Sequence, residues 1–444
     1  MAKLEELFSM KLTENGDVAF DKVSYTNQNL NTLFATEYYQ KNLSEARIGT
    51  SDRDKLFAMF IRDPRYGLGK RDLGRQLMKL ANVPLSNVIK AGRCDDVFAV
   101  YGLTEEVLDY LKREIEAGNE LVKKWMPRYS SQNLMLARTI AKYWGMTKQE
   151  YGHFIKCNTT ENKLSRKTTN EIEFEHVPSL AMLKYYKRFS NGEDTAARFK
   201  QYLEDVKSGK KDLKVSTTTV YDIYKNANSI DPDLFFDKLE KISGNWLPIV
   251  DTSGSMWDDN DSIGKALSVG HYLAKCSNYA PNTVVSFSSR PQLIKLGITP
   301  DRRDNYWCGR LVNGESQYAK EIRSMYTGDC SNTDFGAVMN LLKGLDDVPE
   351  YLVVLSDMEF DYGSRQSKEE LQKIWKDNGY KTKIVWWNFN SRGVTVPEMD
   401  SDGNIYLSGY NPMLLKFLEA GFDGEKFLNK LLDQYEKVVF SENK

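Results

Sequence analysis

Apolar residues recur at helical spacing in the N-terminal half of the chain. The pattern begins just after Asp52, where five apolar side chains share one face: Leu56, Phe57, Met59, Phe60 and Ile61. The same spacing predicts further helices over 70–81, 95–101, 104–126, 131–144 and 147–157. Proline and glycine separate these segments at intervals of roughly 20 to 30 residues, which favours helix pairs stacked in the manner of HEAT repeats.

Short apolar runs replace this pattern in the C-terminal half. Buried strands are predicted at 247–250, 283–287, 351–356, 383–389 and 405–408. Helices are predicted between and after them at 262–277, 317–326, 334–345, 367–378, 411–420 and 424–438. Strands that alternate with helices form a doubly wound, Rossmann-like sheet. The predicted fold class is therefore α + α/β, with an arm over 1–50, a helical domain over 51–243 and an α/β domain over 244–444.

Length and composition agree with two ordinary globular domains. The 444 residues exceed one hydrophobic core, and 41% hydrophobic with 28% charged residues is usual for globular proteins. No apolar run approaches the ~20 residues that cross a bilayer, and the first residues do not resemble a signal peptide, so no membrane association is expected. The five cysteines are widely spaced and odd in number, which favours free thiols and a cytoplasmic location. Three scattered histidines do not favour a histidine triad or a zinc cluster.

Charge is divided unevenly along the chain. The whole chain has a net charge of −1, but residues 121–170 contain ten Lys or Arg and only two acids, Glu150 and Glu161. A polyanion such as RNA is the partner that such a surface favours. Within this stretch Arg138 and Lys142 are four residues apart on the predicted helix 131–144, where they either contact phosphates or form a solvated helix edge.

Two further basic segments are candidate RNA contacts. The loop 61–75 combines Tyr66 and three glycines with five cations: Arg62, Arg65, Lys70, Arg71 and Arg75. Phosphate contact and base stacking suit this composition, although a structural turn held by Arg–Asp pairs is an equal alternative. The Thr-rich loop 163–169 adds Lys163, Arg166 and Lys167 as predicted RNA contacts.

Oxygen-bearing side chains lie directly beside three of the predicted elements. Asp251, Ser253 and Ser255 come directly after strand 247–250, Thr333 precedes a helix, and Asp357 follows strand 351–356. Ligands bind at the carboxyl ends of strands in such sheets, so these five side chains are expected to converge. Oxygen ligands suit a hard cation such as Mg²⁺. The alternative is that Asp-x-Ser-x-Ser is only a turn and helix-cap sequence.

The sequence Asp251-Thr-Ser-Gly-Ser255, with Thr333 and Asp357, resembles the metal-ion-dependent adhesion site of a von Willebrand factor A domain. The resemblance implies that these residues bind Mg²⁺, or Mn²⁺ or Ca²⁺, and that an acidic side chain of a protein partner fills an open coordination position. A degenerate A domain without an ion is the alternative.

A second resemblance extends over most of the chain. It is carried by these segments: Arg62-Asp-Pro-Arg65, Gly92-Arg-Cys-Asp-Asp96, Lys124-Trp-Met-Pro127, His176-Val-Pro-Ser-Leu-Ala-Met182, Leu355-Ser-Asp-Met-Glu-Phe-Asp361 and Val385-Trp-Trp-Asn-Phe389. They look like an uncharacterised family of plants and large phages, itself similar to the Ro autoantigen or TROVE proteins. The resemblance implies a ring or solenoid of HEAT-like helices that binds small or misfolded RNA, including single-stranded ends.

These observations favour a non-enzymatic, RNA-binding ribonucleoprotein component or scaffold. A metal-dependent protein-interaction module without nucleic acid is the main alternative. A metal-dependent hydrolase is least favoured, because Asp251 and Asp357 are both assigned to the ion and no histidine, cysteine or lysine beside them has the spacing of a base or nucleophile.

Overall fold

The chain forms two compact units. The computed structural model describes residues 10–12, 18–20, 49–63, 66–67, 71–130, 132–215, 217–298, 311–345, 347–360, 364–390, 398–399, 403–410, 413–421 and 424–441. One unit, here the α/β unit, comprises Met1–Leu33 and Thr218–Asp423, and the other, the helical unit, comprises Phe34–Thr217 and Gly424–Lys444. A helical region followed by a doubly wound α/β region is the fold class that the sequence predicts, and it is confirmed.

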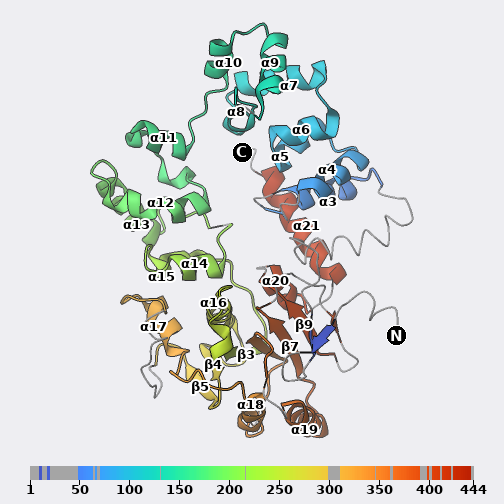
Figure 1. Ribbon diagram of the computed structural model, residues 1–444, viewed down its shortest axis with the longest axis vertical. Helices are drawn as coiled ribbons and strands as arrows, with labels where there is room; N and C mark the ends of the chain where they lie inside the picture. Colours follow the sequence, from blue (N-terminus) through green and yellow to red (C-terminus); the bar gives the residue numbers. More distant parts are fainter. Residues whose placement is uncertain are drawn as a thin grey trace. The chain divides into compact units, whose positions relative to one another are not determined.

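The helical unit is built from short consecutive helices (Figure 1). They are α3 (Asp52–Arg62), α4 (Arg71–Leu80), α5 (Leu85–Ala91), α6 (Cys94–Tyr101), α7 (Glu105–Glu116), α8 (Glu120–Trp125), α9 (Leu134–Tyr143), α10 (Lys148–Phe154), α11 (Thr160–Arg166), α12 (Ser179–Asn191) and α13 (Ala196–Lys207). Neighbours pack in pairs, α3 on α4, α5 on α6 and α12 on α13. Hydroxyl caps fix several starts, and Ser51 and Thr147 form full capping boxes.

The predicted helix 104–126 is interrupted. Gly118 has φ +89°, and the side chain of Asn119 accepts hydrogen bonds from the backbone N–H groups of Leu121 and Val122. A left-handed glycine ends α7, and a new cap starts α8, which turns the chain between them.

The last helix, α21 (Gly424–Ser441), belongs to the helical unit. It packs on α3, where the rings of Phe60 and Tyr435 lie 5.3 Å apart and Arg53 pairs with Asp433 at 2.8 Å. Its sequence position places it in the predicted α/β domain, but its apolar face is buried on α3. The unit division at Thr217/Thr218 likewise differs from the predicted boundary at 243/244, because α14 (Val220–Asn226) packs on the first helix of the α/β unit, α16 (Ser262–Cys276).

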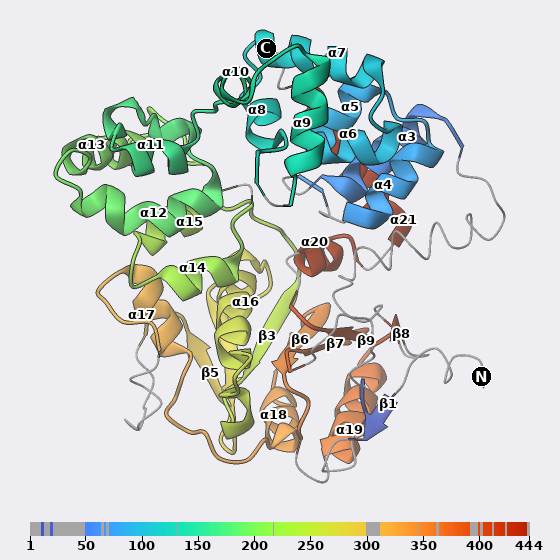
Figure 2. The ribbon, with the colours of Figure 1, turned by 45° about the horizontal axis from the view of Figure 1, so that its top comes forward.

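The α/β unit contains a seven-stranded sheet with the order β5-β4-β3-β6-β7-β9-β8 (Figure 2). Its strands are β3 (Trp246–Asp251), β4 (Thr283–Phe287), β5 (Gln292–Lys295), β6 (Tyr351–Ser356), β7 (Lys383–Asn388), β8 (Glu398–Met399) and β9 (Ile405–Ser408). The central strands are parallel, whereas the edge strands β5 and β8 pair antiparallel to their neighbours. A short antiparallel pair, β1 (Met10–Leu12) with β2 (Val18–Phe20), lies within the predicted arm.

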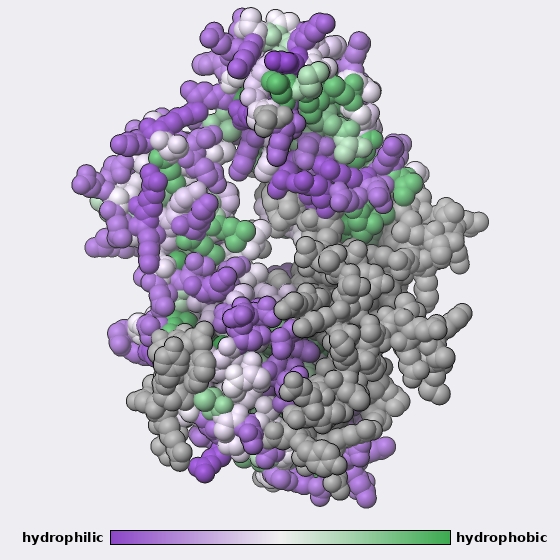
Figure 3. Space-filling model, viewed as in Figure 1, coloured by the Kyte–Doolittle hydropathy of each residue, from purple (hydrophilic) through white to green (hydrophobic). Residues whose placement is uncertain are grey.

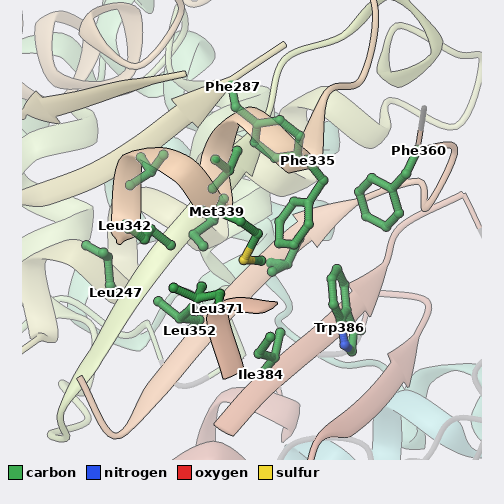
Figure 4. Close-up of a cluster of buried hydrophobic side chains, with 14 of the residues drawn as sticks. Leu247, Phe287, Phe335, Met339, Leu342, Leu352, Phe360, Leu371, Ile384 and Trp386 are labelled. Carbon is green, nitrogen blue, oxygen red and sulfur yellow. The ribbon is translucent and has the colours of Figure 1, made fainter. Parts of the chain in front are cut away.

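Helices pack against the sheet. Helix α16 packs on β3, β4 and β6, and a Cβ at Gly270 would lie 2.5 Å from Val250, so only glycine permits this close approach. A buried cluster joins the central strands to α18 (Phe335–Leu342) and α19 (Ser364–Asp377) (Figure 4). Phe335 and Met339 point into it from α18, and Leu352 and Trp386 from the strands. The remaining helices of the unit are α15 (Pro232–Lys238), α17 (Gln317–Ser324) and α20 (Met413–Glu419).

Candidate functional site

The ends of β3 and β6 bring two of the predicted metal ligands together. Val250 pairs with Leu355 in the parallel register, so Asp251 and Ser356 leave the sheet side by side and Asp357 follows at once. Asp251 is fully buried and Asp357 is 2% exposed. Two acidic side chains are thus held inside the protein at the carboxyl edge of the sheet.

Hydrogen bonds fix the orientation of Asp251. Its Oδ1 accepts from the backbone N–H of Ser253 at 2.9 Å, and its Oδ2 accepts from the hydroxyl of Ser356 at 2.6 Å. The turn after β3 therefore folds back on the aspartate that begins it, an Asx turn typical of Asp-x-Ser.

The hydroxyls of the same turn connect it to Asp357. Ser253 Oγ and Ser255 Oγ are 3.3 Å apart, and the side chain of Ser255 hydrogen-bonds to the Asp357 carboxylate. Asp357 Oδ1 also accepts from the N–H of Glu359 at 3.2 Å, while its Oδ2 is buried and has no hydrogen-bond partner among the described residues. Four of the five predicted ligands are thus linked by direct contacts.

The loop that carries Thr333 contacts the loop that carries the serines through residues 329 and 330. The carbonyl of Cys330 lies 3.1 Å from where a Cβ of Gly254 would be, and the hydroxyl of Thr252 is 3.5 Å from the carbonyl of Asp329. Thr333 itself is 5% exposed, three and four residues beyond these contacts and just before α18. The loop that carries Thr333 is therefore packed on the loop that carries the serines.

The electrostatics of the two carboxylates fit a bound cation. Burial and the nearby Asp357 raise the pKa of Asp251, and burial raises the pKa of Asp357. Two buried carboxylates without a cation are costly, and a divalent ion would offset their charge. The donor set of two carboxylates and several hydroxyls, with the partnerless Oδ2 of Asp357, suits Mg²⁺. No group of three or more His, Cys, Asp or Glu side chains fit for a metal occurs among the described residues, and here the further donors are hydroxyls.

Two of the predicted RNA contacts in the loop 61–75 form ion pairs within the helical unit. Arg62 is 2% exposed and pairs with the buried Asp96 at 2.6 Å, and Arg75 pairs with the same carboxylate at 2.7 Å and with Asp95 at 2.8 Å. The prediction that Arg62 contacts RNA is wrong, because its guanidinium is enclosed and neutralised inside the helical unit. Arg62 and Arg75 instead form Arg–Asp pairs, as the alternative interpretation of this segment predicts. Arg71 is exposed at the start of α4, and Arg65 and Lys70 lie outside the described residues.

Four of the other predicted RNA contacts lie on the surface of the helical unit. Arg138 and Lys142 are exposed along α9, beside Thr139 and Met135, which is 72% exposed. Arg166 and Lys167 are exposed at the end of α11, whereas Lys163 is partly buried and donates to the carbonyl of Glu171 at 2.7 Å. The visible surface over α11–α13 is predominantly hydrophilic (Figure 3).

Two features are absent from the sequence-based predictions. Ser356 holds Asp251, and its position as the last residue of a buried strand directly before Asp357 was the available signal. Arg93 lies over the ring of Trp125 at 3.7 Å, and burial together with Arg71 and Arg62 lowers the pKa of Arg93. This stacked pair joins α6 to α8 across 32 residues of sequence, a separation that no local pattern reveals.

The cysteines and histidines are consistent with structural roles. Among the described residues Cys94, Cys157, Cys276 and Cys330 form no disulfide, and Cys308 lies outside the described residues. His271 is buried on α16, where its Nε2 lies 2.6 Å from a carboxylate oxygen of Glu321. None of the helices described has the length and apolar character needed to span a membrane.

Two families match adjacent parts of the chain. Residues 148–246 match a domain of unknown function, DUF2828, and residues 245–443 match another domain of unknown function, DUF7788. The curated proteins contain no match. Among solved structures, the crystal structure of the Deinococcus radiodurans RO (RSR) protein is similar, with 13% identity, a TM-score of 0.42, and coverage of 92% of this chain and 81% of that chain. Similarity at this level does not establish a common function. Over residues 148–443 the chain is thus similar to two families whose functions are unknown.

Proposed function

We propose that this protein is a non-enzymatic binding scaffold, in which the α/β unit holds a divalent cation and engages a protein partner through it, while the helical unit binds RNA. The main support for the proposed metal site is the pair of buried carboxylates, Asp251 and Asp357, linked by Ser253 and Ser255. Burial of two neighbouring carboxylates is costly when both are charged, and a bound divalent cation would offset that cost.

Asp251, Ser253, Ser255, Thr333 and Asp357 would hold the ion, directly or through water. When bound, the ion supplies a dense positive charge that attracts an anionic oxygen of a partner. Ser255 and Gly254 are exposed, so the ion is accessible from solvent on that side. Mg²⁺ is favoured over Ca²⁺ because the site offers only two carboxylates and otherwise hydroxyls, and Mg²⁺ usually takes one or two carboxylates and keeps several waters.

RNA binding is proposed for the basic surface of the helical unit. Arg71, Arg138, Lys142, Arg166 and Lys167 are exposed there, and Arg93 stacked on Trp125 adds a cation beside an aromatic ring. Exposed cations contact phosphates without requiring a particular base sequence. Single-stranded ends of small or misfolded RNA are the proposed ligand class, and the cytoplasm is the proposed location.

The same geometry favours a binding role over catalysis in this proposal. Both carboxylates are proposed to bind the ion, so neither is free to act as a general base.

One experiment separates the proposed function from its alternative. Calorimetric titration with Mg²⁺ tests the site, and Asp251→Asn, which keeps the shape and removes the charge, should abolish the heat of binding. Gel-shift titration with single-stranded and stem-loop RNAs at low salt then tests the helical unit. Ion binding without RNA binding would favour a metal-dependent protein-interaction module. Metal-dependent hydrolysis of a phosphoester, lost in Asp251→Asn, would contradict the non-enzymatic role.

A further inference from the structure

The loops that frame the proposed metal site are strongly acidic. Residues 251–261, 327–336 and 356–360 contain eight Asp or Glu residues and no Lys or Arg. Two of the acids, Asp251 and Asp357, are proposed ion ligands, and a divalent ion would neutralise them. The other six form the acidic rim: Asp258, Asp259, Asp261, Asp329, Asp334 and Glu359.

The acidic rim is close to the ligands and open to solvent. Asp258 is near enough to Asp357 to raise the pKa of that carboxyl group, and the backbone of Glu359 donates to Asp357. Asp259 is exposed and the other five are partly exposed. Independently of the rim, Oδ2 of Asp357 is buried without a hydrogen-bond partner among the described residues, and an unsatisfied buried oxygen of this kind favours a bound ligand.

Within the described part of the chain, two cations lie near these loops. Lys265 is close enough to Asp258 and Asp261 for both to affect its pKa, and Arg290 is exposed on the loop that follows β4. The six acids of the rim exceed these two described cations by four. A negative field of this kind repels polyanions and attracts cations that approach the edge of the sheet.

We infer that the acidic rim selects the partner of the metal site, and that this partner is a protein segment with one carboxylate flanked by Lys or Arg residues. The carboxylate would meet the ion, and the flanking cations would lie against the rim, with Asp259 and Glu359 as the principal contacts. The phosphate backbone of RNA would be excluded from this edge. The inference rests on the proposed metal site and adds the chemistry of its ligand.

Trp257, two residues after Ser255, allows the two proposals to be separated. An indole this close in sequence to the ligands sensitises Tb³⁺ luminescence, which reports ion binding directly in the full-length protein. The probes are four fluorescent peptides of equal length: a central Asp flanked by Lys, by Ser or by Glu, and a Lys-flanked central Asn. A short single-stranded RNA is the fifth probe, and all five are measured by anisotropy with Mg²⁺ and again with EDTA.

The Lys-flanked Asp peptide should bind at least about tenfold more tightly than the Ser-flanked peptide, because the acidic side chains of the rim attract the lysines of the peptide. Binding should be lost with EDTA and with the Asn peptide. The double variant Asp259→Asn/Glu359→Gln should keep Tb³⁺ luminescence and reduce the preference to about threefold or less. The control Asp237→Asn/Asp377→Asn removes equal charge from exposed sites outside the rim and should leave the preference unchanged.

Equal affinity for the three Asp peptides, or Mg²⁺-dependent RNA binding that requires Asp251, would overturn this inference while the metal site stands. Absence of Tb³⁺ luminescence and of Mg²⁺ heat in the wild-type protein would overturn both proposals.

Discussion

The hydroxyl of Ser356 donates a 2.6 Å hydrogen bond to Oδ2 of Asp251, which ties the last residue of β6 to the last residue of β3. The backbone N–H of Ser253 donates a hydrogen bond to the other carboxylate oxygen of Asp251. Asp251 is therefore held in one orientation by two neighbours, beside the serine turn and Asp357. Groups that orient a ligand contribute strongly to metal affinity.

Ser356→Ala should weaken Mg²⁺ binding about tenfold without unfolding the protein, because it frees Asp251 to rotate and leaves only a small void. Calorimetric titration measures the change. Ser286→Ala is the matched control, since Ser286 is also a fully buried serine, the last residue but one of the neighbouring strand β4, and its hydroxyl has no hydrogen-bond partner among the described residues. Equal loss of affinity in both variants would show that Ser356 does not orient the site.

The buried network of Arg62, Arg75 and Asp96 predicts a stability effect in the helical unit. Asp96→Asn should lower the free energy of unfolding of this unit by about 3–5 kcal/mol, because it leaves Arg62 enclosed without a counter-charge. Hydrogen exchange of α3, α4 and α6 measures this unit separately from the other. Lys55→Gln removes one side of an exposed pair with Asp52 and should cost at most about 1 kcal/mol. A small effect of Asp96→Asn would contradict a structural role for the network.

His271 and Glu321 predict how the stability of the α/β unit depends on pH. The ring of His271 is packed between Phe236 and Tyr318, and burial lowers its pKa, although Glu321 favours the charged form. We expect a neutral ring that donates from Nε2 to Glu321. Unfolding exposes His271, which then binds a proton below about pH 6.5, so stability falls as pH falls through that value.

Glu321 acts in the same direction at lower pH. Despite burial, which opposes the shift, hydrogen bonds from His271 and Gln317 and the nearby Lys275 lower its pKa to about 2. The carboxylate stabilises the folded unit above its unfolded pKa of about 4.3, and this contribution is lost as pH falls towards 2. Denaturant unfolding of the α/β unit from pH 7.5 to 3 checks both effects. His271→Gln should remove the decline near pH 6.5 only; a decline that persists there unchanged would contradict the assignment.

The exposed cations of α9 predict the salt dependence of RNA binding. Arg138→Gln/Lys142→Gln should weaken binding of a single-stranded RNA and reduce the slope of log affinity against log salt concentration by about 1.4, since each phosphate contact contributes about 0.7. Anisotropy titration over a range of KCl concentrations measures the slope. Lys373→Gln/Lys376→Gln removes the same charge from exposed positions on α19. If both double variants weaken binding equally, only net charge matters and α9 is not the contact surface.

Much of the α/β fold follows from local pattern. Strands 283–287, 351–356 and 405–408 have the predicted bounds, because a run of buried β-branched and aliphatic residues between turns has few other solutions. The candidate ligands were found for a related reason: parallel strands put their carboxyl ends at one edge, so Asp251 and Asp357 had to meet.

The features that the sequence does not predict depend on contacts between residues far apart in the chain. The arginines of the segment 61–75 do not reveal that Asp96, 34 residues after Arg62, is buried beside Arg62 and pairs with it. The sequence therefore predicts an RNA-binding loop where the structure has a buried ion-pair network. Similarly, the amphipathic pattern of 424–438 shows that one face is buried but not that α3 covers it. Ser356 was missed because a serine at a strand end is ambiguous until its partner is known.

Crystals grown or soaked with Mn²⁺ and measured at the manganese absorption edge test the metal site most directly. If the proposed site binds the ion, the map will show one strong anomalous peak with metal–oxygen distances of about 2.0–2.3 Å. The peak will be enclosed by Asp251, Ser253, Ser255, Thr333 and Asp357. The peak should be absent from Asp251→Asn crystals. A wild-type map without a peak at that position, under conditions in which Mn²⁺ saturates the protein, would contradict the assignment.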